Sequence, residues 1–208
     1  MTAAPKSQTS PGVSINWRSD VAVVLCLALA LAAGWFFKSA VQGQTQTIED
    51  PLTGLRLSVP ATWQADQDVP NVIVAASDSH SASTFKTRLT VISRQVEAGG
   101  GLDPEQIVER VVQQHESDLL GYHLLSIEPV PAGNLAAGTA RLISYAYVVQ
   151  PESVDRPFQA ALPVVVQAAD YLIFTTDRYY VLTLAADSQD YENQAQNFEL
   201  ILNSVNLP

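Results

Sequence analysis

An uncharged apolar run, Val21–Phe37, is the feature that most constrains this chain. The run holds 17 residues and contains no proline. At a rise of 1.5 Å per residue, such a helix is about 25 Å long, close to the short limit for a hydrocarbon core of about 30 Å. The stem of Lys38 can lie along the apolar surface with its ammonium group in the interface, which lets the helix continue to Val41. The pattern therefore favours a membrane-spanning helix over residues 18–41.

Two other interpretations of the run remain open but are less favoured. A cleaved secretory signal has a shorter apolar core and a small-x-small cleavage site. Cleavage after Ala40 would place Lys38 two residues before the cut, and cleavage after Gly43 is tolerable without being good. A helix buried in a soluble core is disfavoured because this run is apolar on every face. We expect an anchor that the mature protein keeps.

Basic residues near the run predict its orientation. Lys6 and Arg18 precede it, whereas Lys38 alone follows closely. An excess of positive charge marks the cytoplasmic side of a span. The prediction is a disordered cytoplasmic tail over residues 1–17 and an extracytoplasmic or lumenal domain after a linker at residues 42–46.

The charge of residues 44–208 limits the partners of this domain. It carries eight basic and twenty acidic residues, a net charge of −12. Such a domain repels phosphate backbones, so nucleic acid is not expected as a partner. Anionic headgroups are repelled too, which leaves Val21–Phe37 as the contact with the bilayer. The single cysteine, Cys26, lies inside that run and excludes an intramolecular disulfide.

Residues 47–208 show a pattern of many strands and few helices. Leu55, Leu57 and Val59 alternate with polar residues after a turn at residues 51–54, which predicts a half-buried strand. Further strands are expected at residues 72–76, 87–95, 122–129, 140–149, 164–175 and 179–186. Several of these runs are apolar on both faces, which is typical of central strands covered above and below.

Two helices complete the domain. Asp103 is expected as the N-cap of the first, with Pro104 at its first position and Gln106 closing a capping-box-like pair. Apolar residues follow at helical spacing, and Gly121 is expected to end the helix. A second helix is expected from about Asp190. The predicted fold class is α+β, a mostly antiparallel sheet flanked by helices, as in an α/β/α sandwich.

Two segments resemble the PsbP-like family. The first is a turn, an aliphatic strand and a Pro–Trp pair, with matching positions at Gly54, Leu55, Leu57, Pro60 and Trp63. The second is a tyrosine-rich strand at residues 179–184 followed by a helix that closes with Ile201, Leu202 and Ser204. Thr62 and Val205 depart from the family pattern. The resemblance covers about residues 47–208.

This resemblance implies an α/β/α sandwich without enzymatic activity. Relatives in that family act as accessory subunits that dock on larger assemblies, photosystem II among them. We therefore expect a membrane-anchored module that assists the assembly or stability of a membrane protein complex, photosynthetic complexes included. The alternative is an extracytoplasmic protein that binds a solute or an ion. No catalytic, cofactor-binding or metal-binding residue is predicted.

Three sequence patterns are typical of binding sites, but each has a structural interpretation that is favoured. Asp78 with His80, and His115 with Glu116 and Asp118, could offer metal ligands, but a structural site needs about four that converge. Core aromatic positions are favoured over a ligand pocket for Trp63, Tyr145, Tyr147, Tyr171, Tyr179 and Tyr180. The glycines within residues 97–106 precede a helix but lack the lysine of a phosphate-binding loop. His115 is expected to be a partly buried helix residue.

Overall fold

The computed structural model describes residues 17–42, 44–66, 71–96, 103–130, 139–150 and 162–207. The chain divides into two compact units, residues 1–43 and residues 44–208. The expected cytoplasmic tail lies outside the described residues as far as residue 16. The glycines at residues 99–101 also lie outside them.

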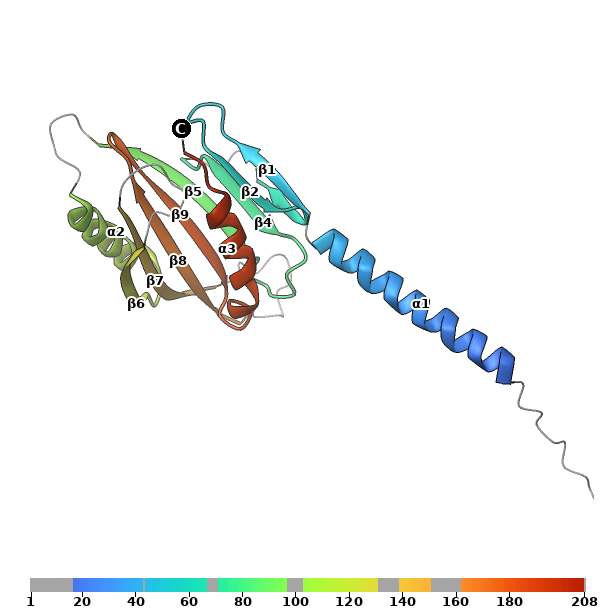
Figure 1. Cartoon of the computed structure of the whole chain (residues 1–208). Helices are drawn as coiled ribbons and strands as arrows, with labels where there is room; N and C mark the ends of the chain where they lie inside the picture. The colour runs from blue at the N-terminus through green and yellow to red at the C-terminus, as the bar shows by residue number, and fades with distance from the viewer. Residues whose placement is uncertain are drawn as a thin grey trace, which may run out of the picture. The chain divides into compact units, whose positions relative to one another are not determined.

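The first unit contains one helix, α1 (Trp17–Gln42), of 26 residues (Figure 1). Every side chain from residue 21 to residue 35 is exposed. In the part of the chain that the structure describes, no helix is both long enough and apolar enough to cross a lipid bilayer.

The second unit begins with a hairpin of β1 (Thr45–Glu49) and β2 (Arg56–Pro60). Its turn depends on Asp50, which accepts a hydrogen bond from the Thr53 amide at 2.8 Å. Gly54 follows with φ of 70°, a conformation that glycine adopts without strain. The expected linker at residues 42–46 is shorter than predicted: Thr45 pairs with Pro60, so β1 has already begun.

The remaining strands form one seven-stranded sheet in which all neighbours are antiparallel. Its order is β3-β4-β5-β9-β8-β7-β6. The strands are β3 (Trp63–Ala65), β4 (Val74–Asp78), β5 (Arg88–Gln95), β6 (His123–Val130), β7 (Ala140–Val149), β8 (Val164–Phe174) and β9 (Arg178–Asp187). Strands that follow each other along the chain are paired, except β5 and β6, which are separated in the sheet by β9, β8 and β7 (Figure 1). The predicted α+β class with a mostly antiparallel sheet is confirmed.

The two faces of this sheet carry separate cores because side chains alternate along each strand. On one face, α2 (Pro104–Asp118) packs its Ile107 and Val108 against β7, β8 and β9. On the other face lie the β1–β2 hairpin, a 3₁₀ turn, η1 (Glu192–Gln194), and α3 (Ala195–Ser204). Both faces of the central strands are therefore covered, one by α2 and the other by the hairpin and α3. This confirms the prediction from strands that are apolar on both faces.

Element boundaries differ from the predictions where capping and turns decide them. Asp103 caps α2 as expected, but its carboxylate accepts from the Glu105 amide at 3.1 Å, and Gln106 is not the partner. The helix ends at Asp118, and Gly121 follows in a turn with φ of 63°.

Two further boundaries shift. The closing helix begins at Ala195, because the chain from Asp190 first forms turns and η1. β4 begins at Val74, two residues later than expected.

Ser204 joins the two segments that carry the family resemblance. Its hydroxyl accepts a hydrogen bond from the Ser58 amide at 2.8 Å and donates to the Ile201 carbonyl at 2.7 Å. The backbones of Arg56 and Asn206 exchange two further bonds of 3.0 and 2.8 Å. The end of α3 is therefore fixed to β2, and both segments contribute to one core.

Candidate functional site

A buried polar contact lies where the end of α2 covers β7 and β8. His115, from the last turn of α2, reaches Asp170 of β8, and its Nε2 lies 2.7 Å from Oδ2 of that carboxylate. Tyr145 of β7 donates its hydroxyl to Oδ1 of the same carboxylate at 3.1 Å. Asp170 is fully buried, while the side chain of His115 is 21% exposed.

These contacts explain how the interior tolerates a carboxylate. Removal of a carboxyl group from water costs several kcal/mol unless hydrogen bonds or an opposite charge compensate. Here both oxygens of Asp170 have a partner, one from the helix and one from the sheet. The pair therefore ties α2 to the sheet at a defined place.

Aromatic rings surround the pair. The ring centroids of His115 and Tyr145 are 4.7 Å apart, and those of Tyr122 and Tyr145 are 5.4 Å apart. The Tyr122 hydroxyl is buried and makes no hydrogen bond to any residue that the structure describes. We call His115, Tyr122, Tyr145 and Asp170 the polar cluster.

The environment of the polar cluster favours neutral tyrosines. Burial, followed by the negative charges of Asp170 and Glu116, raises the pKa of Tyr122 to about 12. Burial also raises the pKa of Tyr145, and Asp170 adds to the effect. Both phenols therefore remain protonated over the physiological range of pH.

The raised pKa of Tyr122 predicts a loss of stability in alkali. In the unfolded chain this phenol ionises near its ordinary pKa of about 10. The unfolded state therefore binds fewer protons between pH 10 and pH 12, and the free energy of unfolding falls across that window. Urea unfolding of the wild type and of Tyr122→Phe at several pH values tests this. We expect a smaller alkaline fall for the variant. Equal falls, with all phenolate absorbance appearing near pH 10, would contradict it.

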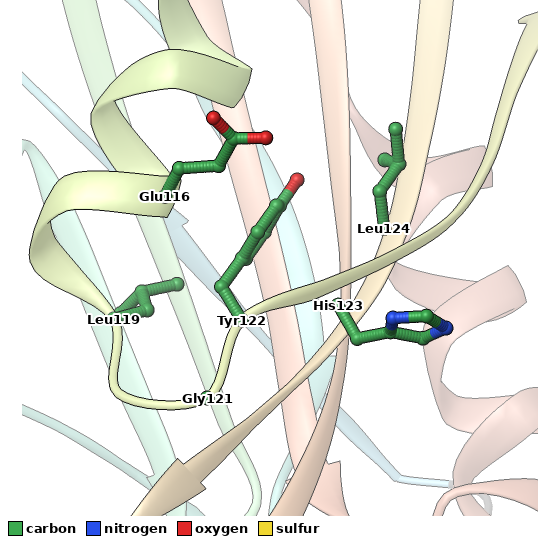
Figure 2. A pocket seen from close by; sticks show the side chains of 6 residues that line it. All are labelled: Glu116, Leu119, Gly121, Tyr122, His123 and Leu124. Atoms are coloured by element: carbon green, nitrogen blue, oxygen red, sulfur yellow. The ribbon is translucent and has the colours of Figure 1, made fainter.

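An open cavity of about 540 Å³ lies beside the polar cluster, at the turn from α2 into β6. It is lined by Glu116, Leu119, Gly121, Tyr122, His123 and Leu124. Figure 2 shows Glu116, Tyr122 and Leu124 on the same side of β6, while the ring of His123 is directed away from them. A carboxylate beside an aromatic ring is an arrangement suited to a cationic group.

The turn that shapes this cavity depends on Gly121. Its positive φ is strained for a residue with a side chain, and a Cβ atom there would lie 3.3 Å from Cγ2 of Val148. The carbonyl of Leu120 accepts a bond from the Val148 amide at 2.8 Å, so the turn is fixed on β7.

The candidate metal ligands of the sequence do not converge. His115 binds Asp170, Glu116 lines the cavity, and Asp118 accepts from Ser117 at 2.9 Å. Nδ1 of His80 lies 3.9 Å from the Asp78 carboxylate. In the described ranges, no group of three or more histidine, cysteine or acidic side chains is placed to hold a metal ion.

The aromatic residues fall into two groups, one on each face of the sheet. Tyr145 and Tyr147 belong to the core under α2, whereas Trp63 and Tyr180 belong to the core under α3. Tyr171 packs at the edge of the second core and Tyr179 at the edge of the first. These residues therefore do not form one pocket, and the core interpretation of this pattern is confirmed.

Asp170 is the site residue that the sequence interpretation missed. The signal was present, because Asp170 is the one charged residue in the apolar strand Val164–Phe174. A carboxylate inside a doubly covered strand needs partners. Its partner His115 lies 55 residues away, however, so the pair could not be assigned without the sheet register.

Comparisons with known proteins define the class of fold. No family model and no curated protein sequence matches the chain. The solution structure of cyanobacterial PsbP (CyanoP) from Synechocystis sp. PCC 6803 is similar, with a TM-score of 0.51 and 13% sequence identity, over 79% of this chain and 92% of that chain. The fold is therefore of the PsbP-like type.

Two further structures are similar at low identity. LpqN from Mycobacterium tuberculosis, described as involved in cell envelope biogenesis, gives a TM-score of 0.53 at 14% identity, over 79% of this chain and 91% of that chain. A structure from Bacteroides thetaiotaomicron gives 0.48 at 9% identity, over 80% of this chain. This chain spans about half of that last structure, 49%.

Proposed function

We propose that this protein is a membrane-anchored interaction module, without enzymatic activity, that assists the assembly or stability of a membrane protein complex. The observation that carries the proposal is an exposed apolar helix, α1, ahead of a separately folded, strongly acidic α+β domain. The domain lies on the extracytoplasmic or lumenal side in this proposal, because Lys6 and Arg18 precede the helix.

The length of the apolar run is close to the short limit for an anchor. The described side chains of α1, residues 21–35, correspond to about 22 Å of helix, short of a hydrocarbon core of about 30 Å. The uncharged run in the sequence continues to Phe37, which brings it to about 25 Å. The backbone remains helical to Gln42.

An accessory role is supported by the kind of protein that shares the fold. CyanoP is a cyanobacterial PsbP, and LpqN is involved in cell envelope biogenesis. The sequence resemblance to the PsbP-like family adds photosynthetic complexes to the candidates. Fold alone does not define function, so the proposal depends on the anchor and on the exposed surface of the domain.

Co-purification from native membranes tests the proposal. The tagged full chain, extracted in an uncharged detergent, is expected to have a mass of about 22.4 kDa plus that of the tag and to carry one partner at near-stoichiometric amount. A mature protein that begins near Gln44 would contradict the anchor. A full-length monomer without a partner in native membranes would contradict the docking role.

A solute- or ion-binding function is the second candidate, and the cavity at the end of α2 favours it. A cavity of about 540 Å³ is large enough for a small molecule. A ligand that binds only the folded state raises the melting temperature. A small solute that raises the melting temperature of the purified wild-type monomer, but not that of Glu116→Ala, would favour ligand binding over docking.

Leu29→Arg tests the anchor directly. Leu29 lies in the middle of the apolar run, where an arginine costs about 2.5–3.5 kcal/mol of insertion free energy. For so short a span, we expect much of the variant to leave the membrane fraction. Leu52→Arg is the matched control, because Leu52 is 91% exposed in the second unit. Equal membrane fractions for the two variants, measured by fractionation and immunoblot, would contradict an anchor.

A further inference from the structure

Exposed apolar side chains gather at one edge of the sheet. β6 is the terminal strand of the seven, and Leu125 and Ile127 on it are 50% and 43% exposed. Leu124 is 37% exposed, and Leu120, in the turn before it, is 57% exposed. We call these four residues the β6 patch. They account for four of the seven exposed large apolar side chains described in residues 44–208.

Acidic side chains border the β6 patch without basic partners. Glu116 and Asp118, in the last turn of α2, are exposed. Neither of the two takes part in the five ion pairs formed among the described residues. An apolar patch with a charged rim is typical of a protein-binding surface. The negative charge of this rim favours a partner segment that carries positive charge.

The cavity continues the β6 patch toward α2. Leu124 belongs to both, and Figure 2 shows its side chain on the same side as Glu116 and Tyr122. A lysine or arginine that entered the cavity would meet the Glu116 carboxylate and the Tyr122 ring. The partner's apolar side chains would cover the leucines and the isoleucine.

The edge of β6 is unsuited to the addition of another strand. The register between β6 and β7 shifts between Leu124 and Ser126, and Pro129 has no amide proton to donate. Bulges and prolines are the features by which proteins prevent edge-to-edge pairing. The partner therefore contacts side chains rather than the strand backbone, which favours an amphipathic segment such as a helix.

Two other kinds of occupant would be repelled by the negative charge around the β6 patch. A second copy would bring Glu116 and Asp118 against the same acids, between domains of net charge −12 each. An anionic lipid surface would meet the same repulsion. A cationic, amphipathic protein segment is the occupant that satisfies both the apolar patch and its rim.

We propose that the β6 patch and its adjoining cavity bind a cationic amphipathic segment of a partner protein, with a lysine or arginine side chain against Glu116. The proposal rests on the docking function proposed above and assigns its surface. The polar cluster supports the site from beneath, because His115 and Asp170 hold the end of α2 on the sheet.

The test uses the full chain in phosphatidylcholine nanodiscs, with empty nanodiscs as the blank. The probe is a fluorescent peptide of leucine and lysine, patterned as an amphipathic helix. We expect Glu116→Gln to weaken binding by about three- to five-fold, and Glu199→Gln, on the exposed face of α3, by less than about two-fold. Leu125→Gln should weaken binding as well, while Leu52→Gln should not.

Hydrogen exchange locates the contact independently of affinity. The peptide is expected to slow the amides of residues 119–128 and to leave those of α3 unchanged. Equal losses for Glu116→Gln and Glu199→Gln, or no binding above the blank, would overturn the proposal. So would dimers that Leu125→Gln abolishes, or tighter binding to phosphatidylglycerol vesicles than to the peptide.

The two proposals fail in different ways. If the partner still co-purifies with the Glu116→Gln/Leu125→Gln double variant, docking uses another surface and the proposed function stands. If the wild-type chain retains no partner in native membranes, the proposed function fails whatever the peptide shows.

Discussion

Trp63→Ala is expected to lower the free energy of unfolding of the domain by about 3–5 kcal/mol, the cost of truncating a large buried aromatic side chain. Trp63 is 2% exposed and belongs to the same core as Leu57 and Ile201. It lies in β3, a strand of three residues at the edge of the sheet. Few backbone bonds therefore hold this strand, and the indole supplies most of its buried apolar surface.

Urea and thermal unfolding followed by circular dichroism measure this loss. For a domain of this size, the expected change in melting temperature is roughly 6–20 °C. Trp35→Ala is the control, because Trp35 is 75% exposed in α1. A midpoint that moves no more than that of the control would show that the opening motif is not part of the core.

Asp170→Ala is expected to cost about 1–3 kcal/mol, because it leaves buried hydrogen-bonding groups without their partner. Asp170 is fully buried, and its loss leaves His115 and the hydroxyl of Tyr145 without their partner. The end of α2 should loosen first, since His115 is its polar contact with β8. Faster hydrogen exchange in residues 111–119 is the local readout.

Asp177→Ala is the matched control for this substitution. Asp177 lies in the turn between β8 and β9, exposed, and its partner Arg178 is the next residue. We expect little change in its unfolding midpoint. Equal effects of the two substitutions would contradict the structural role of Asp170.

A double-mutant cycle tests whether the bond between His115 and Asp170 contributes to stability beyond the burial of the two side chains. His115→Ala and Asp170→Ala should be non-additive, with a coupling energy of about 0.5–3 kcal/mol. Additive losses would mean that the two side chains contribute independently and that the bond between them adds nothing.

The sequence by itself determined the features that depend on neighbours in the chain. The turn at Gly54 was predictable because glycine adopts positive φ at little cost. The strand of Leu55, Leu57 and Val59 and the start of α2 at Pro104 followed from periodicity and from capping chemistry. Strands apolar on both faces indicated a sheet covered above and below, and the two cores confirm it.

The tertiary structure decided what depends on contacts between distant segments. β3 was not predicted, since three residues are too few for a period to show; its pairing with β4 defines it. Asp170 and His115 are 55 residues apart, and Ser58 and Ser204 are 146 apart, so only the sheet register brings each pair together. The exposed β6 patch has the same origin. The sequence shows that Leu125 and Ile127 are apolar, but only the position of β6 at the end of the sheet leaves their side chains in water.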